Sequence, residues 1–116
     1  MKVLALIWGD ENAFDRLTND EQEQVRDQYR AFARSAEGKL VGGAELASTS
    51  SATTVRVRDG ETIVTDGPFA ETREQLGGFF VFDVDDVDEA TDLAARSPGA
   101  SRATIELRPA YEDGTS

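Results

Sequence analysis

Apolar residues follow two different periods along the chain. The segments 2–8 and 77–84 are apolar at nearly every position, which predicts short strands that are buried on both faces. The segment after Thr18 instead carries apolar residues at spacings of four, three and four, and it predicts a helix that ends at Gly38. The stripe of that helix consists of Val25, Tyr29, Phe32 and Ala36.

The remaining elements are read from turn residues and caps. Segment 40–46 predicts a strand loosened by two glycines, and a loop rich in Ser and Thr follows it at 47–52. Asp59-Gly60 between two β-rich runs predicts a hairpin, because both turn residues tolerate positive φ. The expected hairpin strands are 53–58 and 61–65, and a turn follows at 66–69. A second helix is expected to begin after Asp86 and to end at 97–99. The last expected strand is 102–108.

This order of elements predicts the fold class. The chain is of the α+β class, and it reads as strand-helix-strand, then a hairpin, then strand-helix-strand. That order is typical of a ferredoxin-like split β-α-β domain with an inserted β-hairpin. With 116 residues the chain has the size of one domain, expected at 1–112, and 113–116 reads as a flexible tail.

Strands that are apolar on both faces predict a homodimer. Two short helices cover only one face of a four-stranded sheet, so the other face would leave Leu, Phe and Trp side chains in water. A second copy that packs sheet to sheet would cover this face. The alternative is that the hairpin or the C-terminal tail folds over it.

Charge and composition narrow the possible partners. The chain carries 12 basic and 23 acidic residues, a formal charge of −11, which repels nucleic acid and anionic membranes. It contains no Cys and no His, so thiolate and imidazole chemistry is excluded, and we expect neither a metal nor another cofactor. No apolar run has the roughly 20 residues needed to span a membrane. We therefore expect a cytoplasmic protein.

One block of residues resembles a known family. The residues Asp66-Gly67-Pro68-Phe69-Ala70-Glu71-Thr72, with Glu74 to Phe79 after them, resemble the DGPF-motif branch of the YCII-related proteins. The resemblance covers nearly the whole chain. It implies a dimeric α/β-barrel of ferredoxin-like protomers with a cleft beside the sheet, a bacterial origin, and for some relatives a link to extracytoplasmic-function sigma factors.

A histidine proposed as catalytic in the wider family is absent from this chain. A His–Asp pair has been proposed as a catalytic dyad for the wider family, and this sequence has no His with which to form it. Counted back from Gly38, the position of that His falls near Asp27. Whether the chain is an enzyme at all is therefore left open.

Three residues around the turn are the first candidates for a ligand site. Asp66 could be a base or a ligand hook, and Glu71 and Arg73 follow it closely. An arginine in a partly closed cleft can hold an anionic group with two hydrogen bonds. The structural alternatives are an Asp that bonds turn amides and a surface ion pair.

Further candidates lie on the strands and the first helix. Arg56, Arg58 and Arg108 could hold an anion, or they could pair across strands with acids such as Glu61 and Glu106. Asp27 could be an acid on the inner edge of the first helix, or merely a solvated residue. Trp8, like Tyr29, could border a pocket or pack in the core.

Three functions are compatible with these residues. The first is a small-molecule enzyme or binding protein that takes a small polar or anionic ligand between sheet and helices, with Asp66, Glu71 and Arg73. The second is a non-enzymatic accessory or regulatory partner of an extracytoplasmic-function sigma factor, in which the acidic surface meets a basic protein. The third is a structural dimer without a ligand.

Overall fold

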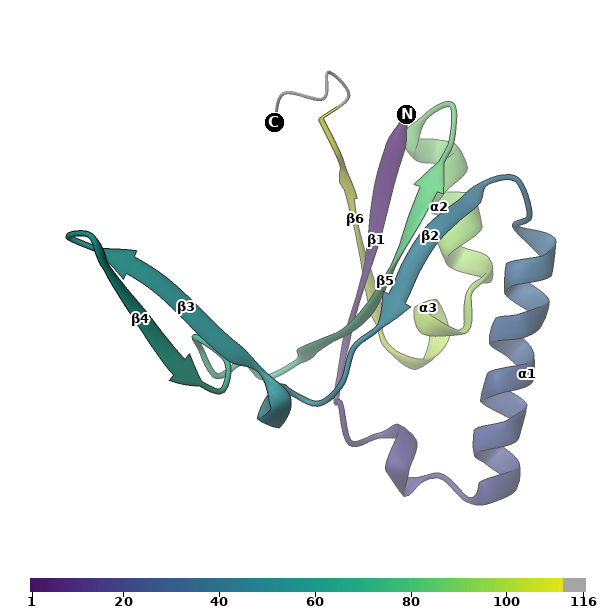
Figure 1. Cartoon of the computed structure of the whole chain (residues 1–116). Coiled ribbons are helices and arrows are strands. Elements are labelled where there is room, and N and C mark those ends of the chain that lie inside the picture. Colours follow the sequence, from purple (N-terminus) through teal and green to yellow (C-terminus); the bar gives the residue numbers. More distant parts are fainter. Residues whose placement is uncertain (112–116) are drawn as a thin grey trace.

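The computed structural model describes residues 1–111, and they form one sheet layer, one helix layer and a projecting hairpin (Figure 1). The strands are β1 (Lys2–Gly9), β2 (Leu40–Glu45), β3 (Thr53–Arg58), β4 (Glu61–Asp66), β5 (Gln75–Asp83) and β6 (Thr104–Pro109). The helices are η1 (Phe14–Arg16), α1 (Asn19–Ser35), η2 (Thr49–Ser51), α2 (Val87–Arg96) and α3 (Pro98–Arg102).

The central sheet has the order β2-β5-β1-β6. Every neighbouring pair in it is antiparallel. With β3 and β4 set apart as a separate two-stranded sheet, this is the strand order of a split β-α-β, ferredoxin-like unit. The predicted α+β class and the inserted hairpin are thus confirmed.

The core lies between the sheet and the helices. Val3, Ala5 and Phe82 are fully buried on the face of the sheet that α1 and α2 cover. The helix stripe predicted from the sequence is also confirmed, because three of its four residues are buried and Tyr29 is half-buried. Phe32 reaches down to the Phe80 ring at 5.3 Å and to the Phe82 ring at 6.4 Å.

Both long helices begin at the predicted caps. The Thr18 hydroxyl accepts the Glu21 amide at 3.2 Å, and the Glu21 carboxylate accepts the Thr18 amide at 2.9 Å. This reciprocal capping box satisfies two amides that the helix leaves free. At α2 the Asp86 carboxylate accepts the Glu89 amide at 2.8 Å.

Two glycines allow β2 and β5 to approach closely. A Cβ at Gly78 would lie 2.9 Å from the Ala44 carbonyl oxygen, and one at Gly43 would lie 2.4 Å from that of Phe79. The register of β5 against β1 also shifts between Gly78 and Leu76, so Gly77 forms a bulge.

Some boundaries predicted from the sequence are wrong. Of the residues expected to end the second helix, Ser97 caps α2, but Pro98 and Gly99 already form the first turn of the short helix α3. Arg102 belongs to α3, so the last strand begins at Thr104 rather than at 102. A proline at a helix start ends one helix and can begin the next, because it has no amide to donate.

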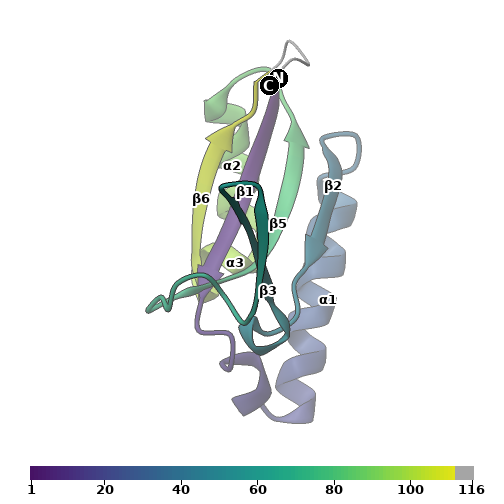
Figure 2. The same ribbon diagram turned by 60° about the vertical axis from the view of Figure 1, so that its left-hand side comes forward.

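The hairpin β3–β4, which we call the arm (residues 53–66), projects away from the sheet on the side opposite the helices (Figures 1 and 2). Its turn is as predicted, with φ of 52° at Asp59 and 78° at Gly60. The arm does not pack on the second face of the central sheet, the face opposite the helices. The expectation of a flexible tail at 113–116 lies outside the described residues.

Candidate functional site

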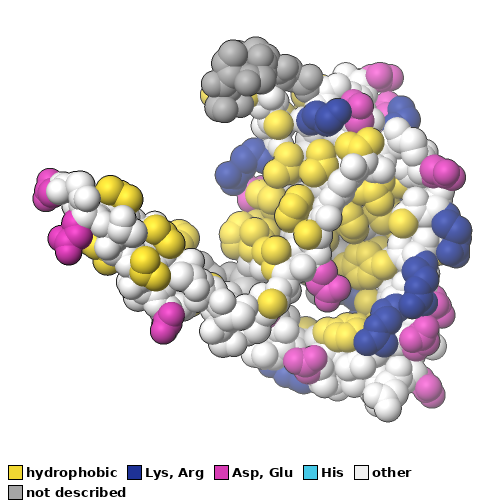
Figure 3. Space-filling view, in the orientation of Figure 1, with side chains coloured by type: hydrophobic (Ala, Val, Ile, Leu, Met, Phe, Trp, Pro, Cys, Tyr) yellow, Lys and Arg dark blue, Asp and Glu magenta, His cyan; other side chains and the backbone are white. Residues whose placement is uncertain are grey.

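The sheet face opposite the helices, called the open face, is mostly apolar. Alternation along β1 places Leu4, Leu6 and Trp8 on it, because their neighbours Val3 and Ala5 are buried beneath the helices. In the register, Leu4 pairs with Val81, and Leu6 with Phe79. These five side chains are only half-buried, and Figure 3 shows hydrophobic side chains gathered over this part of the molecule.

Three side chains with polar groups meet on the open face, Trp8 from β1 and Glu106 and Arg108 from β6. The Trp8 indole donates to the Glu106 carboxylate at 3.1 Å, and the Arg108 guanidinium donates to its other oxygen at 2.6 Å. The hydrogen bond from Arg108, and then that from Trp8, hold the pKa of Glu106 below its ordinary value. We call these three residues the Trp8 cluster.

The connection between β4 and β5 lies at the same end of the sheet as Trp8. Trp8 pairs with Leu76 at the start of β5, and Gln75 pairs with Gly9. The Gln75 amide group donates to the Thr72 carbonyl at 2.9 Å, while its oxygen accepts the Glu11 amide at 3.1 Å. The side chain of Gln75 thereby fixes the connection to the end of β1.

A short network closes the root of the arm. The Gly67 amide donates to the Ala52 carbonyl at 2.7 Å, and the Thr54 hydroxyl donates to the Gly67 carbonyl at 2.7 Å. Gly67 has φ of 93°, a value that favours glycine. On the approach to the arm, the Glu11 carboxylate accepts the Thr49 amide at 2.9 Å and its hydroxyl at 2.7 Å. These bonds set where the arm leaves the sheet.

The predicted site residues do not come together in one site. Three of them lie exposed at the arm root and in the connection that follows it: Asp66, Glu71 and Arg73. Within residues 1–111, none of these three side chains forms an ion pair. They lie on the arm side of the sheet, so they do not share a cleft between sheet and helices. Arg56 is exposed on the arm opposite Ile63.

Asp27 is not on the inner edge of α1. Its side chain is 65% exposed and accepts from the Arg30 guanidinium at 2.6 Å, one helical turn away. Because α1 covers the buried face of the sheet, Asp27 and Trp8 lie on opposite sides of it. The solvated alternative for Asp27 is the one the structure shows.

Trp8 is the predicted residue that the structure brings together with other polar groups. The sequence suggests Glu106 only as a cross-strand partner for an arginine, whereas the structure pairs it with Arg108, two residues along the same strand. Its hydrogen bond with Trp8 was missed. Alternation along β6 places Glu106 and Arg108 on one face, but the sequence does not reveal which strand lies beside β6.

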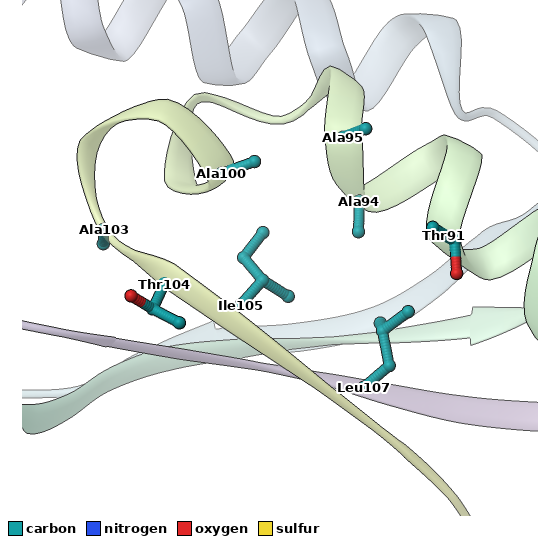
Figure 4. A pocket seen from close by; sticks show the side chains of 8 residues that line it. All are labelled: Thr91, Ala94, Ala95, Ala100, Ala103, Thr104, Ile105 and Leu107. Atoms are coloured by element: carbon teal, nitrogen blue, oxygen red, sulfur yellow. The ribbon is translucent and has the colours of Figure 1, made fainter.

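A cavity of about 380 Å³ lies elsewhere, between α2, α3 and β6 (Figure 4). Apolar side chains make up most of its wall. The Thr91 hydroxyl in the wall donates a hydrogen bond to the Val87 carbonyl at 2.8 Å. No charged residue lines it. Its lining is Thr91, Ala94, Ala95, Ala100, Ala103, Thr104, Ile105 and Leu107.

The chain resembles known proteins over nearly its whole length. The family model of the YCII-related domain matches residues 1–112. The chain belongs to the YCII-related family. It is also 41% identical over 113 residues to an uncharacterized protein of Rhizobium meliloti (strain 1021), an alignment that covers 94% of this chain and 91% of that relative. The YCII-related domain thus includes the open face, the arm and the connection between them.

No group of three or more acidic side chains among residues 1–111 is arranged to hold a metal ion. None of the helices in the same range is both long and apolar enough to cross a membrane.

Proposed function

We propose that this YCII-related protein binds a small ligand with an anionic or polar group on the open face of its sheet, and that it acts as a homodimer. The observation that carries the proposal is the Trp8 cluster, a charged and hydrogen-bonded group within an apolar face. Binding sites for small molecules commonly combine apolar walls with a few placed polar groups. A surface that only packed against protein would have little need for an ion pair there.

The geometry favours an anionic group beside Arg108. A guanidinium carries five N–H donors, and Glu106 engages Arg108 through one recorded bond. Its side chain remains 65% exposed, so the other donors can reach a carboxylate or a phosphate. Trp8 supplies a flat aromatic surface next to it. We propose Asp66, Glu71 and Arg73 as a polar rim at the arm root, and Arg56 as a further anion contact.

The same cluster supplies no general acid. Because the pKa of Glu106 is lowered, its carboxylate stays ionised at neutral pH and has no proton to donate. The chain has no His, so the His–Asp dyad proposed for the wider family cannot operate here. The proposal therefore includes no reaction.

The homodimer follows from the apolar remainder of the open face. Exposed apolar patches of several hundred Å² commonly mark interfaces. The resemblance to the DGPF-motif branch, carried by residues 66–79, implies a dimeric α/β-barrel in which such faces meet. We propose both the branch and the barrel for this chain. The cytoplasmic location expected from the sequence stays a prediction.

Trp8 is the single tryptophan of the chain, so its fluorescence reports on the proposed site alone. We would titrate the protein with a panel of small carboxylates and phosphates, and follow Trp8 emission and the melting temperature. A panel member should shift both, and Arg108→Gln should weaken its binding by about tenfold or more, as expected for one lost charged hydrogen bond.

Arg34→Gln provides the control for this experiment. Arg34 is an exposed arginine in the last turn of α1, on the helix side of the sheet, so its loss changes net charge equally without touching the open face. Binding should be unchanged in Arg34→Gln. If no panel member shifts either signal, or if both variants weaken binding equally, the proposed site is wrong.

A second candidate function rests on the acidic surface. The excess of 11 acidic charges would complement a basic protein face, and an extracytoplasmic-function sigma factor is the partner that the family resemblance suggests. Such an association should weaken steeply with salt. Mixing the protein with a purified sigma factor of this class in low and high salt tests it directly, and the absence of a complex in low salt would eliminate it.

A further inference from the structure

The arm exposes apolar side chains that no other part of the described chain covers. The pairing of β3 with β4 places Val55, Val57 and Val64 on one face of the arm, which we call the valine face. Their exposed fractions are 60%, 59% and 61%. Phe69, just beyond the root, is 78% exposed. Phe69 therefore does not belong to the core.

An arm of this kind is not stable by itself. A two-stranded hairpin with neither face packed is at best marginally stable in water, because its ladder does not offset the entropy of ordering its residues. The turn and the register are nevertheless regular along the whole arm. We infer that something packs on the valine face.

The arm and the open face are presented to the same side of the molecule. Figure 2 shows the arm in front of the central sheet, and Figure 3 shows a hollow between the arm and the body. Hydrophobic side chains on the arm and on the body are both visible in that single view. One body that approached from this side could therefore contact both surfaces.

We propose that this body is a second copy of the chain, which enters the hollow so that the arm of each copy packs its valine face on the other. The inference rests on the proposed homodimer and adds the part of the chain that holds it together. A two-fold axis would repeat the contact, so both arms and the apolar parts of both open faces outside the Trp8 cluster would be covered at once and the assembly would close.

The size of the surface fits this partner. The three valines and Phe69 each leave more than half of their surface exposed. The half-buried apolar residues of the open face add to this area. Stable interfaces bury roughly 800 Å² per partner, so the arm and the open face would be buried together in a stable dimer.

Adjacent residues of β4 provide a matched test. Val64 lies on the valine face, and Thr65 lies on the opposite face, paired with Thr54. In sedimentation experiments on the full chain, Val64→Asp should raise the dimer dissociation constant by roughly a hundredfold, because each dimer loses the contact twice. Thr65→Asp should change it by less than about threefold. Since the valine face does not pack on the body of its own chain, both variants should keep the helical bands of the parent's far-ultraviolet circular dichroism spectrum, which report on the body and not on the arm.

Hydrogen exchange gives a second readout of the arm. Amide protection across residues 53–66 should rise with protein concentration in the parent chain, and it should not rise in Val64→Asp. Protection that is the same at all concentrations would overturn the inference, because the arm would then be stabilised within its own chain.

The outcomes separate this inference from the proposed function. A dimer that is equally strong in both variants would overturn the role of the arm and leave the homodimer and the Trp8 site standing. A chain that stays monomeric at all concentrations would overturn both the arm contact and the homodimer. Ligand binding is read separately from Trp8 emission in the Arg108→Gln and Arg34→Gln variants.

Discussion

Gly43→Ala should be strongly destabilising, and its neighbour Gly42 supplies the control. A methyl group at residue 43 would lie 2.4 Å from the Phe79 carbonyl oxygen and 3.2 Å from the Phe80 Cα. Both atoms belong to the backbone of β5, so they cannot rotate away. The first distance is about 1 Å short of ordinary contact, which begins at 3.4 Å. Gly43 also has φ of +152°, which alanine adopts rarely.

The cost can be estimated from these two effects. A backbone conformation unsuited to alanine costs about 1–3 kcal/mol. Moving β2 away from β5 would also weaken hydrogen bonds of the ladder, each worth about 1 kcal/mol. We therefore expect Gly43→Ala to lower the free energy of unfolding by about 2–4 kcal/mol, and the melting temperature by about 10 °C.

Gly42→Ala should behave differently on the same strand. A methyl group there would meet the Val81 side chain at 3.6 Å, an ordinary contact, and the backbone is not left-handed. Because alanine restricts the unfolded chain more than glycine does, the variant should be unchanged or more stable by up to about 1 kcal/mol. Urea unfolding followed by circular dichroism measures both variants. Equal free energies of unfolding would refute the close approach of β2 to β5.

Two further predictions concern single side chains. Thr18→Ala removes the hydroxyl that accepts the Glu21 amide, and it should lower the free energy of unfolding by about 1 kcal/mol, as measured by urea denaturation. Asn19→Ala, beside it, should have a smaller effect because Asn19 is not the cap. The pKa of Glu106 is lower in the folded chain than in the unfolded one, because Arg108 and Trp8 donate hydrogen bonds to its carboxylate. These hydrogen bonds therefore stabilise the fold fully above the unfolded pKa of about 4.3, and their contribution is lost as the pH falls through the folded pKa. Glu106→Gln should therefore lose less stability than the parent between pH 7 and pH 3, and an unchanged pH profile would contradict the hydrogen bonds assigned to Glu106.

The local structure was largely predictable from the sequence, because its causes are local. The capping box at Thr18, the turn at Asp59-Gly60 and the helix stripe from Val25 to Ala36 each depend on residues a few positions apart. The nearly unbroken apolar run at 2–8 likewise showed that β1 is apolar on both faces. The short helix α3 was missed because the same proline that ends α2 also begins α3.

The candidate site depended on contacts between distant segments. Trp8 meets Glu106 only because β6 pairs with β1, and 98 positions separate the two residues. Asp27 could not be placed from its type, because a charged residue beside an apolar stripe can face either way. Asp66, Glu71 and Arg73 were grouped by nearness in sequence, and the fold carries them to the arm side of the sheet.

The sequence by itself determined the elements, their caps and the existence of a second apolar face that needs a cover. Those properties follow from side-chain period and from hydrogen bonds within one turn of chain. Only the tertiary structure decided that the hairpin stands apart from that face, with its valines exposed, and that a tryptophan, a glutamate and an arginine meet on it. Both outcomes depend on which strands become neighbours and on the angle at which the arm leaves the sheet, and neither is encoded within a single segment.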